Sequence, residues 1–64
     1  MQKDILIIIP VLNEVNNILP IIEKIFKFLS GKRKHILFID DNSKDGTREK
    51  IFLAQKKFNK IYLI

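Results

Sequence analysis

Two adjacent carboxylates, Asp40 and Asp41, follow directly on a run of four apolar residues in this 64-residue chain. The next segment, residues 42–47, is rich in Asn, Ser, Asp and Gly, which favour turns. This pattern is typical of a buried strand that delivers acids to the edge of a sheet, where a polar ligand can bind. Successive side chains on a strand point to opposite faces. We therefore expect one acid to face the helix-covered layer or a backbone amide and the other to face the binding crevice, although alternation alone does not assign them.

A second polar pair, Asn13 and Glu14, follows an apolar run from Ile5 to Leu12. The Ile and Leu residues of this run show no polar alternation, which predicts a strand over 4–11 that is buried on both faces. Pro10 cannot donate to a sheet ladder and therefore marks the end of the strand. The run is far shorter than the roughly 20 residues that a membrane-spanning helix needs.

A helix is expected after this first loop. Apolar residues at spacings of three and four predict it from about Asn17 to Leu29. Asn16 or Asn17 can cap its start, because the side-chain oxygen of either can accept from a free amide of the first turn. Gly31 suits the left-handed conformation that follows a helix end.

The remaining elements complete an alternating pattern. A second strand over 35–39 leads into the acidic loop, a second helix begins near Thr47, whose hydroxyl can cap it, and a third strand covers 61–64. Strands and helices in this order, with short connections, predict an α/β fold in which a βαβαβ unit forms a parallel sheet with right-handed crossovers. Ligands bind such sheets at the carboxyl ends of the strands, where both polar loops lie.

Charge is distributed unevenly along the chain, whose net charge is +5. The acids gather at the two loops, and we interpret the basic blocks as solvated surface, with no nucleic-acid partner expected. An anionic membrane surface is the alternative partner for these blocks. The absence of cysteine fits a cytoplasmic protein, and a peripheral location at the cytoplasmic face of the membrane is the alternative. The basic blocks are Lys32, Arg33 and Lys34, and Lys56, Lys57 and Lys60.

Two sequence motifs are separated by a characteristic number of residues. Ile-Pro-Val-Leu-Asn-Glu over residues 9–14 is followed about 25 residues later by Ile-Asp-Asp-Asn-Ser-Lys-Asp-Gly-Thr over residues 39–47. This pair resembles the start of family-two glycosyltransferases, and is most similar to the polyprenyl-phosphate branch, which includes dolichyl-phosphate mannosyltransferase. The resemblance implies a GT-A fold, with this unit as its Rossmann-like N-terminal part. Residues 1–64 would then be a partial nucleotide-sugar-binding domain, truncated at its C-terminal end.

The resemblance also implies a substrate class. The family transfers a sugar from a nucleoside-diphosphate donor, here a GDP- or UDP-sugar, to an acceptor such as a polyprenyl (dolichyl) phosphate at a membrane surface. Leu12 occupies a place where many relatives have an aromatic residue, which leaves the nucleotide open. The residues that would bind the nucleotide sugar, carried over by position, are Pro10, Leu12, Glu14, Ile39 and Asp41.

The acids fit the nucleoside end of such a donor. Ribose hydroxyls and the amino or imino groups of a base can donate to Glu14 and Asp41, whereas carboxylates repel a bare diphosphate. Possible supporting residues are Asn13, Asp40, Ser43 and Asp45. Scaffold roles compete for several of these, since Asp40 can accept amides of its own loop, Asn13 can hold the first loop, and Asp45 with Gly46 favours turn formation and helix capping.

We expect no catalytic residue and no metal ligand within these 64 residues. The family uses Mg²⁺ or Mn²⁺, held by a later Asp-x-Asp motif, and a later acidic base, and neither pattern is recognisable here. The chain alone is therefore expected to be inactive in sugar transfer. The alternative is a non-catalytic nucleotide-binding or assembly fragment. A phospho-receiver domain is disfavoured because its acidic pair would follow the first strand, and a dinucleotide-binding unit because no Gly-x-Gly-x-x-Gly follows that strand.

Overall fold

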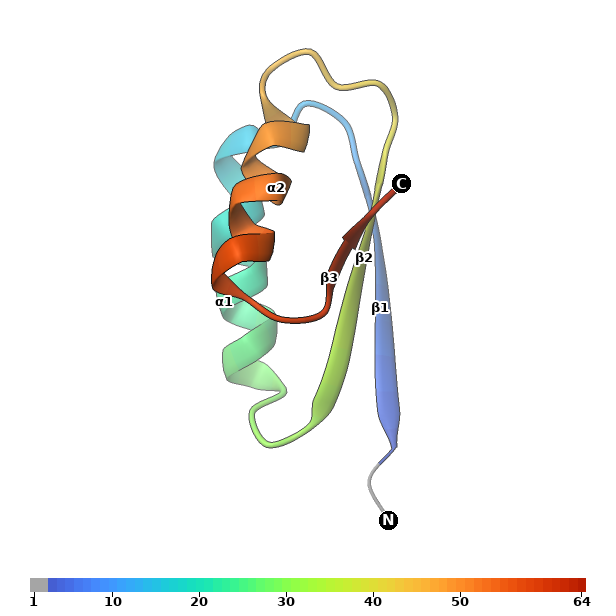
Figure 1. Ribbon diagram of the computed structural model, residues 1–64, viewed down its shortest axis with the longest axis vertical. Helices are drawn as coiled ribbons and strands as arrows, with labels where there is room; N and C mark the ends of the chain where they lie inside the picture. The colour runs from blue at the N-terminus through green and yellow to red at the C-terminus, as the bar shows by residue number, and fades with distance from the viewer. Residues whose placement is uncertain (1–2) are drawn as a thin grey trace.

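A three-stranded parallel sheet with two helices on one face makes up the computed structural model, which describes residues 3–64 (Figure 1). The predicted α/β fold with a βαβαβ order is therefore confirmed. A single 3-10 turn, η1, precedes the first helix. In chain order the elements are β1 (Asp4–Val11), η1 (Val15–Asn17), α1 (Ile18–Phe28), β2 (Arg33–Asp40), α2 (Thr47–Lys57) and β3 (Ile61–Leu63).

The central strand of the sheet is β2. It pairs with β1 from Asp4 opposite Arg33 to Val11 opposite Asp40, and its middle pairs with β3. Because the strands are parallel, the loops that follow β1 and β2 meet at the carboxyl edge, drawn at the top of Figure 1. The two polar segments are thus brought to one end of the molecule.

The core lies between the sheet and the helices. Alternate strand residues enter it, since a strand presents every second side chain to the same face. Phe38 on β2 is the largest fully buried side chain. The rings of Phe26 and Phe58 pack against the core and meet edge to face, at 5.0 Å between centroids. The buried apolar residues are Val11, Ile18, Ile22, Ile36, Phe38, Ile51, Ala54 and Ile61.

The first strand was expected to be buried on both faces, and this prediction is wrong within residues 3–64. Ile7 and Ile9 pack against the core, but Leu6 and Ile8 are 58% and 55% exposed. The strand order β1-β2-β3 means that both right-handed crossovers run in the same direction across the sheet. Both helices therefore cover one face, and the other face of the sheet is open (Figure 1).

The helix α1 begins differently from the prediction. Neither Asn16 nor Asn17 caps it, because a 3-10 turn precedes the helix and the Asn17 side chain donates to Glu14 Oε2 instead of accepting a backbone amide. The helix ends at Phe28, one residue before the predicted Leu29, and Gly31 beyond it has the expected left-handed conformation with φ +80°. No helix in the described part of the chain is long and apolar enough to cross a membrane.

The strand β2 is longer than predicted. It covers 33–40 instead of 35–39, because its ladder with β1 extends to the charged residues at both ends, Arg33 and Asp40. The third strand ends at Leu63, one residue earlier than predicted. The extension of β2 matters for the site, since it makes Asp40 the last residue of the strand and Asp41 the first of the loop.

Candidate functional site

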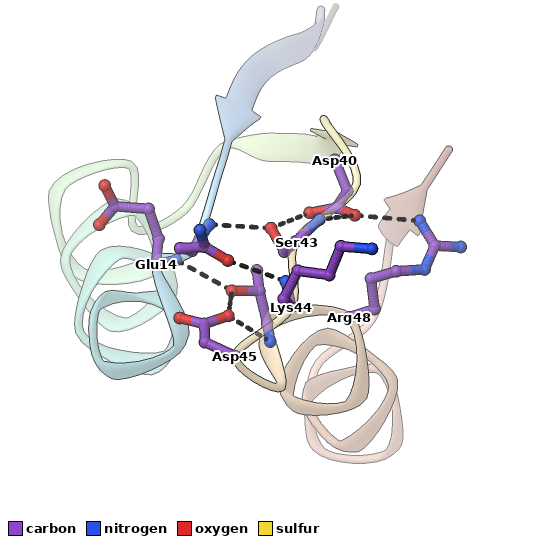
Figure 2. A network of polar contacts seen from close by, with 8 residues as sticks. Glu14, Asp40, Ser43, Lys44, Asp45 and Arg48 are labelled. Atoms are coloured by element: carbon purple, nitrogen blue, oxygen red, sulfur yellow. Dashed lines mark hydrogen bonds and ion pairs between the residues drawn. The ribbon is translucent and has the colours of Figure 1, made fainter.

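Asn13 connects the loop after β1 to the loop after β2. Its amide donates to Ser43 Oγ at 2.8 Å, and its side-chain oxygen accepts the Lys44 amide, also at 2.8 Å (Figure 2). Asn13 has φ +52°, a left-handed conformation that Asn tolerates better than most residues. The Asn13 side chain is thus used by the scaffold, as one of the two interpretations from the sequence expected.

Thr47 and Asp45 form a second connection between the loops. Thr47 is fully buried, and its hydroxyl accepts the Glu14 amide at 2.9 Å while donating to Asp45 Oδ1. The other Asp45 oxygen accepts the Val15 amide at 3.2 Å. The loop after β1 and the start of α2 are therefore joined by one hydrogen-bonded unit. It consists of the Glu14 and Val15 amides, the Thr47 hydroxyl and the Asp45 carboxylate.

The expected cap of α2 by the Thr47 hydroxyl is wrong. Thr47 lies inside the first turn, and its hydroxyl points back to the loop after β1. The carboxylate of Asp45 accepts the Thr47 amide at 3.0 Å instead. Gly46 between them has φ +93°, a conformation that glycine adopts without strain, so the chain can turn sharply into the helix. Asp45 therefore holds the turn before the helix, as the turn interpretation of Asp45 and Gly46 expected, while the N-cap position is taken by Gly46.

Asp40 belongs to the scaffold. Its side chain is fully shielded from solvent, accepts the amide of Ser43 at 3.1 Å and the Ser43 hydroxyl, and pairs with Arg48 Nη1 at 3.4 Å. The Ser43 hydroxyl, with the Ser43 amide and the Arg48 guanidinium, holds the pKa of Asp40 below its ordinary value, although burial acts in the opposite direction. A continuous chain of contacts runs from Asn13 through Ser43 and Asp40 to Arg48 (Figure 2).

Asp41 is exposed, and it shares none of the contacts that Asp40 makes. Its backbone amide donates to the Val11 carbonyl at 3.0 Å, which continues the pairing of β1 and β2 by one step. Within residues 3–64 its carboxylate has no hydrogen-bond or ion-pair partner. The question that alternation left open is thus decided, with Asp40 turned to the scaffold and Asp41 left available to a ligand.

A pocket of about 350 Å³ lies beside β1 and α1, and is lined in part by Pro10, Glu14 and Lys24. The Glu14 carboxylate points away from Asp40 and Ser43 (Figure 2), and one of its oxygens accepts from Asn17, which leaves the other without a partner among residues 3–64. The five residues predicted to bind the nucleotide sugar are therefore not all in one cavity. Pro10 and Glu14 line it, whereas Leu12, Ile39 and Asp41 lie outside it on exposed positions.

Sequence reasoning missed the roles that three residues have in this region. Arg48 pairs with Asp40, Asn17 orients Glu14, and Lys24 brings a cation to the pocket. The spacing of three between Glu14 and Asn17 was a usable signal, because it equals one turn of a 3-10 helix. Arg48 lies eight positions after Asp40. No local sequence pattern predicts an ion pair between two residues on opposite sides of a turn.

Divalent metal ions do not fit the acids present. No group of three or more His, Cys, Asp or Glu in the described residues could hold such an ion. The oxygens of Asp40 and Asp45 are already engaged with Ser43, Arg48, Thr47 and Val15. Hard cations need several free oxygen ligands. These residues are therefore a scaffold for the loops and do not form a metal centre.

Acid should loosen this scaffold. The pKa of Asp45 is lowered mainly by the Thr47 hydroxyl, with the amides of Val15 and Thr47 adding to it, and the pKa of Asp40 is lowered as described above. Both groups are ionised when folded and take up a proton more readily when unfolded. Their contribution is fully present above the ordinary value of 3.8 and is lost as the pH falls through the lower folded values.

We therefore predict that the melting temperature falls steeply as the pH is lowered below about 4. Thermal unfolding followed by circular dichroism from about pH 7 to about pH 3 measures this. The variant Asp45→Asn should melt lower at neutral pH but lose less further stability in acid. A pH profile of that variant parallel to the wild type would contradict the role given to Asp45.

Comparison with known protein families gives a match for this chain. The profile of the family described as Glycosyl transferase family 2 matches residues 6–64, which include both loops and every strand and helix from the middle of β1 onward. Neither the curated proteins nor the solved structures give a significant match.

Proposed function

The chain belongs to glycosyl transferase family 2, and from that premise we propose that its carboxyl-edge loops bind the nucleoside of a nucleoside-diphosphate sugar. Family membership gives the general activity, sugar transfer, and family members generally use nucleotide-sugar donors. That the donor is a GDP- or a UDP-sugar, and which residues recognise its nucleoside, are the parts that we propose.

The unpartnered carboxylate of Asp41 carries this proposal. The carboxylates of Asp40 and Asp45 are already hydrogen-bonded within the scaffold. Asp41 and one oxygen of Glu14 are the carboxylate acceptors of the two loops that have no partner among residues 3–64. Ribose hydroxyls and base N–H groups can donate to them, and hydrogen bonds to a charged acceptor are about twice as strong as neutral ones. Because the loops are already held together, little ordering is needed when a ligand binds.

Glu14 and Asp41 would contact different parts of the nucleoside. Glu14 lines the pocket with Pro10, whereas Asp41 lies on an exposed position beside the end of β1. We assign the nucleoside to both residues, with Leu12 and Ile39, which are 51% and 38% exposed, offering apolar contact to the base or ribose. The diphosphate would be held by groups other than these acids, since like charges repel. Its cation would need other ligands, because no group of three or more His, Cys, Asp or Glu in the described residues could hold a metal ion.

The acceptor that we propose is a polyprenyl phosphate, as in the dolichyl-phosphate mannosyltransferase branch. Its support is the form of the acidic segment over residues 39–47. A second candidate is a non-catalytic assembly element, which the open apolar face of the sheet favours, with Leu6 and Ile8 more than half exposed.

Nucleoside binding can be tested by two-dimensional NMR with isotope-labelled protein. We expect GDP or UDP to shift the amide signals of Glu14, Asp41 and their neighbours, and the free nucleoside to compete. Pyrophosphate without a nucleoside should leave these signals in place. The proposal fails if pyrophosphate competes as well as the nucleotide does, or if the shifted signals map to β3 and the end of α2.

A further inference from the structure

Phe28, the last residue of α1, is 88% exposed, more than any other large apolar side chain in the described chain. Beside it lies a hollow of about 720 Å³, which is lined by mostly apolar atoms. Phe28 makes none of the ring contacts that Phe26 makes on the buried side of the same helix. We call this region the Phe28 surface, formed by Lys24, Ile25, Lys27, Phe28 and Leu29.

Positive charge surrounds this aromatic ring. Lys24 and Lys27 lie on the exposed side of α1, and Lys32 is exposed in the loop that follows it. These three ammonium groups have no hydrogen-bond or ion-pair partner within residues 3–64. The neighbouring cations are partly engaged, since Arg33 pairs with Asp4 at 3.5 Å and Lys34 donates to the Leu29 carbonyl at 3.3 Å.

Acidic groups are sparse near the Phe28 surface. Glu23 on α1 is exposed, and Asp4 is shared between Arg33 and His35. Most other acids lie in the loops at the opposite end of the sheet, drawn at the top of Figure 1, while α1 ends toward the bottom. The molecule is thus basic at the end of α1 and acidic at the candidate site, which gives the Phe28 surface an attraction for anions.

We propose that the Phe28 surface docks on an anionic lipid membrane, with the Phe28 ring inserted among the acyl chains and Lys24 and Lys27 against the headgroups. An exposed aromatic ring can enter the acyl-chain boundary while the lysines beside it contact anionic headgroups. A single-stranded nucleic acid would instead need several rings on which successive bases stack, and one ring at a helix end does not supply them. The lipid surface is therefore the partner that fits both the ring and the charge.

Docking in this way orients the candidate site. A helix bound at the interface lies in the plane of the membrane. Lys24 lines both the hollow beside Phe28 and the pocket of Glu14, so the two surfaces adjoin along α1. The carboxyl edge of the sheet would thus stay close to the membrane and remain open to the aqueous phase. This inference does not depend on nucleoside binding, which a separate measurement tests.

Vesicle flotation tests the proposal. The probes are vesicles of phosphatidylcholine with about 30% phosphatidylserine and vesicles of phosphatidylcholine alone, at about 20 mM and about 500 mM salt. The protein should float with the anionic vesicles at low salt and lose most of this binding at high salt. Phe28→Ala should reduce the partition coefficient about tenfold, while circular dichroism remains unchanged because the side chain is exposed.

Matched variants distinguish membrane binding through the Phe28 surface from binding through positive charge anywhere on the protein. Lys24→Gln/Lys27→Gln should weaken flotation about tenfold or more. Lys56→Gln/Lys57→Gln removes the same charge from exposed positions on α2, and Phe52→Ala removes a half-exposed ring there; both should bind almost as the wild type does. The proposal is overturned if the two double variants lose binding equally, if Phe28→Ala binds normally, or if anionic vesicles do not retain the protein. Binding to a single-stranded RNA that competes with vesicles and ignores Phe28 would also overturn it.

Discussion

Replacing Asp41 with Asn is expected to weaken nucleoside binding by about 1–3 kcal/mol, which corresponds to a loss of affinity of roughly 5- to 150-fold. Asn keeps the shape of the side chain but removes its charge and turns one acceptor into a donor. Because the Asp41 carboxylate makes no contact with the described protein, this change should leave the stability of the fold nearly unaltered. Calorimetric titration with GDP and UDP measures the affinity, and chemical denaturation measures the stability.

A matched control for this variant is Glu49→Gln, which removes one exposed negative charge from the first turn of α2. It should bind nucleotide as the wild type does, because the residue takes no part in the loop network. Equal nucleotide affinity in Asp41→Asn and the wild type would show that Asp41 is a surface residue without a role in binding. Equal losses in both variants would show that only the overall charge matters.

Thr47→Val should destabilise the fold by about 1–3 kcal/mol and weaken nucleoside binding as well. Val has nearly the same volume as Thr, so the packing of this fully buried position is kept while the hydroxyl is removed. The Glu14 amide then loses its acceptor, and an unpaired donor in a partly buried position costs stability. The loop that carries Glu14 would also lose its connection to α2. Urea denaturation and hydrogen exchange at the Glu14 amide measure the two effects.

Thr47→Ser is the control for this prediction, because it keeps the hydroxyl and removes only a methyl group. It should retain slow exchange at the Glu14 amide and cost less stability than Val does. If Thr47→Val exchanges as slowly as the wild type at Glu14, the hydroxyl does not hold the loop. If Ser is as damaging as Val, packing is the dominant contribution of this position.

Assignment of functional roles within the acidic pair was not decided by the alternation of side chains along the strand. Alternation on a strand required Asp40 and Asp41 to differ, but the direction was decided by Ser43 and Arg48, which occupy the carboxylate of Asp40. Thr47 was placed correctly at the start of a helix, yet its hydroxyl serves the other loop. In both cases the element was predictable, whereas the partner of the side chain was not.

The sequence by itself determined the order of strands and helices, the parallel sheet and the edge at which the polar loops meet. Those features follow from apolar periodicity, turn residues and the handedness of crossovers, all of which act over short stretches of chain. Only the tertiary structure decided which acids are scaffold, which remain available, and that one face of the sheet is open. Asp40 is held by Ser43 and Arg48, three and eight positions away, whereas Val15 with Asp45 and Glu14 with Thr47 join the two loops across 30 and 33 positions. Such pairs become neighbours only when the strands are in register.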